Sequence, residues 1–243
     1  MPFDLHRQLQ ELYAGEDGQR EVRINGSFVA DVVRHGVIYE IQTRKLSNIK
    51  SKITSLLETT PIVIVYPVSV HTTIVHCDGV DLRECSRRPS PKQGQALDAF
   101  SETVYLAHLL AHPNMALEIL LVDTEDIRIK GDPHAATRRR RRRRRHSEWT
   151  TVNRRLTATH GRVRLDTPAD GLQLLPPAVK FPFCTRDLAD ATGASLSRAQ
   201  QILYTLFHMG ALRRVGRTRS GWSYEPAQTE QGFPSGHTSG PTP

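Results

Sequence analysis

The chain has little of what secreted and membrane proteins require. It contains three cysteines, Cys77, Cys85 and Cys184, an odd number at wide spacings that does not suit a disulfide framework. No apolar run approaches the length of about 20 residues that a membrane span needs. The first residues, Met-Pro-Phe-Asp-Leu-His-Arg, lack the apolar stretch of a signal peptide. These absences predict a cytoplasmic protein with no membrane partner.

Aromatic residues are also sparse, at 6%, but an apolar fraction of 38% can build a core. A length of 243 residues suggests one or two domains. The net charge of +8 is unevenly placed, because residues 138–145 are eight consecutive arginines. Residues 1–137 are mildly acidic, with 14 Lys/Arg against 18 Asp/Glu, and residues 146–243 are mildly basic, with 11 against 7. This asymmetry indicates a polyanionic partner, most simply DNA.

A pair of carboxylates stands out in residues 29–43. Two β-branched runs flank the turn signal Arg34-His35-Gly36, which is typical of a hairpin. Alternation along the second run puts Val37, Tyr39 and Ile41 on one face and Ile38, Glu40 and Gln42 on the other. Asp31 lies across the hairpin, so Asp31 and Glu40 could converge. Two carboxylates suit a hard cation such as Mg²⁺ and leave positions open for water and a phosphate.

These residues resemble the PD-(D/E)xK nucleases, whose fold is called restriction-endonuclease-like. The sequence Asp31…Glu40-Ile41-Gln42 looks like the variant with glutamine in place of the lysine, and Ala30 stands where the family has proline. The resemblance covers about the first half of the chain and implies metal-assisted phosphodiester hydrolysis with Mg²⁺ or Mn²⁺. Asp31, Glu40 and the Ile41 carbonyl would hold the ion, and Gln42 would orient the attacking water. Lys45 could supply the missing cation, and Glu11 a further acidic ligand.

The order of elements agrees with that α/β fold. Helical spacing predicts a helix over Leu5 to Tyr13 and another over Lys45 to Leu57. A strand meander lies between them, with Asn25-Gly26 as a hairpin turn. Later predictions are a buried strand over 61–68, another strand over 70–76 and a strand over 116–122 that 125–130 extends. A loop is predicted over 83–95 and a helix over 95–112. The 40–61 connection has the length that a parallel crossover requires.

The C-terminal part is similar to a winged helix-turn-helix over residues 183–226. Thr185 is predicted to cap a short helix over Arg186 to Thr192, which Gly193 ends. Ser195 or Ser197 is predicted to cap a second helix over Arg198 to Met209. Two short strands then enclose a basic turn, as in a wing. Candidate nucleic-acid contacts here are Arg198, Gln200, Gln201, Arg217 and Arg219. The alternative is a protein-interaction or dimerisation module, which would make the protein a homodimer.

Other basic residues have two interpretations each. The run from Arg138 to Arg145 could bind phosphates or could be a solvated linker. A disordered arm between domains would do both. Lys92, after Ser90-Pro91, could meet a phosphate or solvent. The predicted division is a restriction-endonuclease-like domain (1–131), an Arg-rich linker (132–148), a connecting segment (149–182), a winged helix (183–226) and a disordered tail (227–243).

The sequence therefore predicts an α/β protein with a restriction-endonuclease-like mixed sheet flanked by helices, plus a C-terminal winged helix. The leading functional hypothesis is a Mg²⁺- or Mn²⁺-dependent DNA nuclease. The alternative is a non-catalytic DNA-binding regulator that keeps a degenerate nuclease fold. The missing lysine of the nuclease motif favours this alternative. A third class, a protein-interaction adaptor, would have no salt-dependent affinity for DNA.

Overall fold

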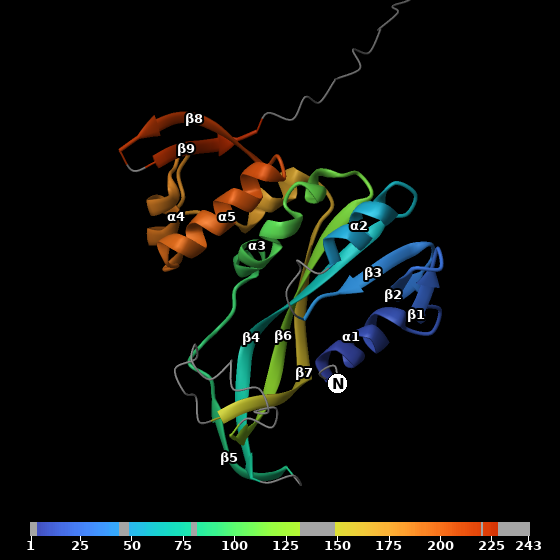
Figure 1. Ribbon diagram of the computed structural model, residues 1–243. Coiled ribbons are helices and arrows are strands. Elements are labelled where there is room, and N and C mark those ends of the chain that lie inside the picture. Colours follow the sequence, from blue (N-terminus) through green and yellow to red (C-terminus); the bar gives the residue numbers. More distant parts are fainter. Residues whose placement is uncertain (1–3, 44–48, 79–81, 132–148, 220, 228–243) are drawn as a thin grey trace, which may run out of the picture.

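The computed structural model describes residues 4–43, 49–78, 82–131, 149–219 and 221–227. In this part of the chain a mixed sheet carries helices on both faces, and a smaller group of two helices and a hairpin follows (Figure 1). The fold is therefore mixed α/β, as predicted. No helix in these residues is long and apolar enough to cross a membrane.

The helices and strands are as follows. The α-helices are α1 (Asp4–Ala14), α2 (Lys50–Leu57), α3 (Ala99–Glu102), α4 (Thr185–Thr192) and α5 (Leu196–His208). The 3₁₀ helices are η2 (Ala96–Asp98), η3 (Thr103–Leu106), η4 (Leu109–Ala111) and η5 (Pro168–Leu174). The strands are β1 (Gln19–Ile24), β2 (Phe28–Arg34), β3 (Val37–Ile41), β4 (Ile62–Asp78), β5 (Arg83–Pro89), β6 (Met115–Lys130), β7 (Trp149–Leu165), β8 (Leu212–Thr218) and β9 (Gly221–Pro226).

Both predicted hairpin turns form where the sequence favours positive φ. His35 and Gly36, with φ of 50° and 76°, join β2 to β3 directly after the Arg34–Val37 pair. Asn25 and Gly26, with φ of 49° and 71°, lie between β1 and β2. Two consecutive residues in this region give the backbone twist that matches antiparallel strands, and asparagine and glycine tolerate it best.

The sheet places β3 and β4 side by side in parallel. The strand order is β1-β2-β3-β4-β6-β7, and β5 pairs with the far half of β4. Helix α2 makes the crossover from β3 to β4, which confirms the predicted connection. Strand β4 is also parallel to β6, and β7 returns antiparallel to β6.

The two faces of the sheet have separate apolar layers. Helix α1 packs on one face with Leu5, Leu9 and Tyr13, beside Val32 and Ile41. The other face carries a larger layer that includes α2, the 96–111 helical segment and the inner sides of α4 and α5. Strand β3 contributes to both layers, since Ile41 belongs to the first and Ile38 to the second. The predicted alternation of its side chains is thus confirmed.

Three predictions from local pattern were wrong or incomplete. Residues 83–89, predicted as a loop, form β5, whose side chains are all exposed, so no apolar period marks it. The expected helix over 95–112 is a series of short α and 3₁₀ turns. Residues 149–165, assigned to a connecting segment, form β7 at the sheet's edge. In the sequence, the arginine run falls between β6 and β7, outside the described residues.

The C-terminal helices pack against the segment that follows β5. Gly193, with φ of 67°, ends α4, and the Ser195 hydroxyl caps α5 by accepting the Arg198 N–H. Thr185, predicted as the cap of α4, is instead its first residue, and Cys184 occupies the cap position. The Thr205 hydroxyl donates to the Phe100 carbonyl at 2.7 Å, inside the protein. The Cα of Gly171 lies so close to Leu206 and Phe100 that an added Cβ would meet them at 3.1 and 3.3 Å. These contacts join the C-terminal unit, which consists of α4, α5, β8 and β9, to the sheet through one continuous core.

Candidate functional site

The site begins where β2 and β3 stop pairing. Their register runs from Arg34–Val37 to Val32–Tyr39. Beyond it, the Asp31 carboxylate accepts the Ile41 N–H, with Oδ2 at 2.8 Å from the nitrogen. A side chain thus takes the place of a strand carbonyl. This holds Asp31 against the β3 backbone, one residue from Glu40.

The other oxygen of Asp31 faces helix α1. His6 Nε2 lies 3.4 Å from Oδ1, and the Gln10 amide donates to the same oxygen at 3.4 Å. The hydrogen bond to Asp31 is the main reason that the pKa of His6 is raised, and it outweighs the opposing effect of burial. Hydrogen bonding to the Ile41 backbone and the charge of Glu40 act in the same direction. His6 therefore faces the same groups that were expected to bind a metal.

Glu40 is buried on the α2 side of the sheet, with 1% of its surface exposed. Its Oε1 lies 2.5 Å from the Lys52 ammonium, and Lys52 also donates to the Val29 carbonyl. Burial raises the pKa of Glu40 to about 7 in spite of the Lys52 charge, and the nearby Asp31 carboxylate adds to the rise. A carboxylate that ionises near neutrality beside a second carboxylate is poised to gain from a cation.

The donor set fits Mg²⁺ or Mn²⁺ in chemistry. The Asp31 and Glu40 carboxylates and the Ile41 carbonyl are oxygen ligands of the kind these ions prefer. Burial is the main cause of the raised pKa of Glu40, and repulsion from the Asp31 carboxylate adds to it. A divalent ion would relieve this repulsion. In the described residues no group of three side-chain ligands includes either carboxylate, so the backbone or water would complete the coordination.

Lys52 and His6, which contact the Glu40 and Asp31 carboxylates, were not predicted from the sequence. Lys52 comes 12 residues after Glu40, from α2, whereas a search for Glu-x-Lys looks only two residues ahead. His6 is one helical turn before Gln10 on α1 and carries no local sign of its partner. Both could have been found by asking which polar residues of the two flanking helices point inward.

The remaining predicted residues lie in several places. Gln42 is half-buried at the end of β3, where its N–H donates to the Val65 carbonyl at 2.9 Å. Glu11 points away from Asp31 and pairs with Arg7 and Arg20 at the surface. Lys92 is exposed in the loop after β5. Lys45 and the arginines from Arg138 to Arg145 lie outside the described residues.

The C-terminal unit presents a basic, aromatic surface. Gln200 and Gln201 are exposed on α5, and Arg217 and Arg219 are exposed at the β8–β9 end. Arg214 stacks between the rings of Phe207 and Trp222, with its guanidinium carbon 4.4 and 4.9 Å from their centres. The groove between α5 and the hairpin also includes exposed apolar side chains, which are Leu196, Tyr204 and Trp222.

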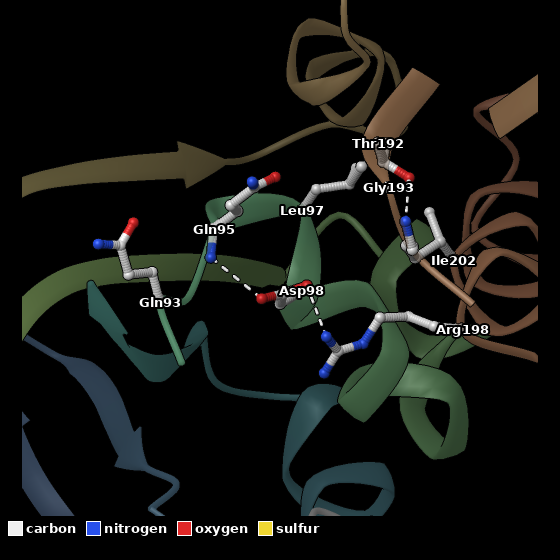
Figure 2. A pocket seen from close by; sticks show the side chains of 9 residues that line it. Gln93, Gln95, Leu97, Asp98, Thr192, Gly193, Arg198 and Ile202 are labelled. Atoms are coloured by element: carbon white, nitrogen blue, oxygen red, sulfur yellow. Dashed lines mark hydrogen bonds and ion pairs between the residues drawn. The ribbon is translucent and has the colours of Figure 1, made fainter. Parts of the chain in front are cut away.

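Arg198 does not share that surface, because it pairs with Asp98 across the contact between the two parts. Its Nη1 lies 3.2 Å from Asp98 Oδ1, and Asp98 also accepts the Gln95 N–H at 3.0 Å. Figure 2 shows this pair in a small pocket between the 93–98 segment and the α4–α5 turn at Gly193. Arg198 therefore helps to dock the C-terminal unit.

Comparisons with known proteins give a family and one relative. The model of a family described as "Domain of unknown function (DUF8091)" matches residues 3–166, which run from α1 to the end of β7. An "Uncharacterized protein" of Treponema pallidum (strain Nichols) is 29% identical over 203 residues, which cover 82% of this chain and 76% of the relative. No solved structure matches.

Proposed function

Because the chain belongs to the DUF8091 family, a domain of unknown function, its activity must be inferred from its site, and we propose metal-dependent hydrolysis of DNA phosphodiester bonds. The main support is the grouping of Asp31, Glu40 and Lys52 beside the end of β3. Two carboxylates and a cation are what such a reaction requires.

The arrangement of elements supports the same proposal. A helix, three antiparallel strands, a crossover helix and a parallel strand follow each other, as in the restriction-endonuclease-like fold that the Asp31…Glu40-Ile41-Gln42 sequence resembles. The departure of Gln42 from the family pattern matters less once Lys52 is considered. The ammonium that the strand lacks reaches Glu40 from the next helix.

The residues divide the work as follows. Asp31, Glu40 and the Ile41 carbonyl would hold Mg²⁺ or Mn²⁺, which when bound supplies an acidified water and offsets phosphate charge. Lys52 favours the ionised form of Glu40 and brings positive charge to the phosphate site. Gln42 orients the water. His6, held by Asp31, must release its proton or turn aside before a cation binds.

The C-terminal unit would bind the DNA as a winged helix. Support comes from the order α4, α5, β8, β9 and from the isolated backbone bridge between Phe183 and Tyr224 on β9. Gln200 and Gln201 would face a groove, and Arg217 and Arg219 would contact phosphates. Arg198 is set aside from this role by its pairing with Asp98.

Cleavage assays with the full chain test the proposal. Plasmid, single-stranded and branched DNA are incubated with Mn²⁺ or Mg²⁺, and the variants Asp31→Asn, Glu40→Gln and Lys52→Met are compared with wild type. We expect activity to fall by about 100-fold or more in each, as for loss of a group that stabilises transition-state charge. Glu11→Gln, an acidic residue of α1 that points elsewhere, is the matched control. Absence of cleavage, or cleavage unaffected by Asp31→Asn, would contradict the proposal.

A second function, non-catalytic DNA binding, is favoured by one observation. His6 faces Asp31, and Lys52 faces Glu40, so the cluster balances its charges without a metal. This alternative predicts DNA binding that persists in EDTA and no hydrolysis with any divalent ion. A protein-interaction adaptor would instead show no salt-dependent affinity for DNA.

A further inference from the structure

A second group of ligand side chains lies on β4, β6 and β7, apart from the Asp31 cluster. His71, Asp123 and His160 each offer one ligand atom, and these atoms all lie within 4.8 Å of one another. The three residues come from three adjacent strands, and 52 positions separate His71 from Asp123. Their side chains are between 27% and 61% exposed, so an ion from solvent could reach them.

The sheet is distorted at this point on both sides of Asp123. In the pairing of β4 with β6, Ser69 is opposite Val122 and His71 is opposite Asp123, so Val70 is an extra residue. In the pairing of β6 with β7, Leu121 is opposite Gly161 and Val122 is opposite Thr159, so His160 is extra. Bulges of this kind redirect side chains and are common beside functional sites.

The redirected side chains meet at one carboxylate oxygen. His71 Nδ1 lies 3.0 Å and His160 Nε2 2.8 Å from Asp123 Oδ1, and the His71 N–H donates to the same oxygen at 3.2 Å. Burial opposes the ionisation of Asp123, but the hydrogen bonds from His160 and His71 outweigh it and lower the pKa of Asp123. The two histidines and the carboxylate thus converge at one point.

We propose that His71, Asp123 and His160 bind a transition-metal dication, with Zn²⁺ as the preferred ion. Two imidazole nitrogens and a carboxylate oxygen suit Zn²⁺, whereas Mg²⁺ and Ca²⁺ favour oxygen ligands alone. Tetrahedral bonds of about 2.0–2.1 Å put ligand atoms roughly 3.3 Å apart. The present separations of 2.8 and 3.0 Å from Asp123 therefore need to widen by only a few tenths of an ångström.

Three protein ligands leave a fourth position for water, which is the arrangement of catalytic rather than structural zinc sites. The proposed ion differs in ligand chemistry from the one at Asp31 and Glu40, so the two proposals stand independently. Binding requires neutral imidazoles whose ligating nitrogens carry no proton.

Metal titration of the untagged full chain tests the site. Zn²⁺ is measured by competition with a chromophoric chelator, and Co²⁺ by its visible absorption, which reports nitrogen and oxygen ligands. We expect the chain to take one Zn²⁺ ion from the chelator. The affinity for Zn²⁺ should fall by more than about 100-fold in His71→Ala and in His160→Ala, since even residues that only contact metal ligands contribute 10–100-fold. Asp123→Asn should weaken binding while keeping the shape of the carboxylate.

The matched control is His35→Asn, which removes an exposed histidine from the β2–β3 turn, where asparagine accepts the positive φ. It should bind Zn²⁺ like wild type. Thermal unfolding of each metal-free variant verifies that it folds. The proposal is overturned if Zn²⁺ does not bind at millimolar concentration, or if it binds equally well to the folded double variant His71→Ala/His160→Ala.

Discussion

Charged side chains are used differently in the sheet and in the C-terminal unit. In the sheet, the side chains of Glu40 and Lys52 are only 2% and 13% exposed and are paired with each other. In the C-terminal unit, Arg217 and Arg219 stand at the surface, and even the paired Arg213 is 51% exposed. Burial makes the first pair matter for stability and ionisation, whereas the exposed arginines are available to a polyanion.

Removal of one buried charge should have the largest effect. Glu40→Ala leaves the Lys52 ammonium without its partner in a mostly buried position. We expect the free energy of unfolding to fall by about 3 kcal/mol, as for other broken buried pairs. Urea unfolding measures it. A loss below about 1 kcal/mol would mean that Lys52 reaches solvent easily and that the pair resembles a surface ion pair.

The next largest effect is on the pH dependence of stability. The pKa of Glu40 rises from 4.5 in the unfolded chain to about 7 in the folded protein, so the folded state binds the proton more tightly. This contribution to stability is complete below about pH 4.5 and is lost as the pH rises through about 7, a change on the order of 1–3 kcal/mol.

The measurement is the difference in unfolding free energy between wild type and Glu40→Gln across this range. His6 also makes the protein less stable as the pH rises, since its pKa is raised as well. Taking the difference between wild type and Glu40→Gln reduces the contribution of His6, which is present in both proteins. If the two proteins change in parallel with pH, Glu40 is not the group responsible.

A smaller effect is expected where the two regions meet. Arg198→Met removes the charge that pairs with Asp98 but keeps most of the apolar stem. The free energy of unfolding should fall by about 0.5–1 kcal/mol, with little change in affinity for DNA. Arg213→Met, whose partner Glu225 lies in the same hairpin, is the control for loss of an ion pair within one unit. A large loss of DNA binding in Arg198→Met would instead give Arg198 a direct contact.

The smallest effect on stability should come from the exposed arginines. Arg217→Ala and Arg219→Ala should leave the unfolding free energy within about 0.5 kcal/mol of wild type. Each should weaken DNA binding uniformly across sequences and reduce the salt slope of the binding constant by about 1. Fluorescence titrations at several salt concentrations measure this, with Arg20→Ala in the sheet part as the control. Equal slopes in all variants would exclude the hairpin from DNA contact.

The sequence predicted those helices and strands whose apolar spacing, turn residues or caps all lie within a few neighbouring residues. The β2–β3 hairpin follows from its β-branched runs and from the turn at Gly36. Helix α5 follows from its apolar face and from two candidate caps, of which the structure uses Ser195. Strands β5 and β7 were not predicted, because they lie at edges of the sheet and alternate little between buried and exposed residues. Their positions depend on backbone hydrogen bonds to β4 and β6, which side-chain pattern does not record.

For the candidate sites, the two carboxylates could be identified from the sequence, since Asp31 and Glu40 lie on adjacent strands of one short hairpin. Their partners could be identified only from the folded chain, because Lys52 and His6 come from helices on opposite faces of the sheet. The same is true of His71, Asp123 and His160, which meet through bulges in three long strands. The physical reason is that side-chain alternation is a local property, whereas strand order and helix packing bring distant residues together.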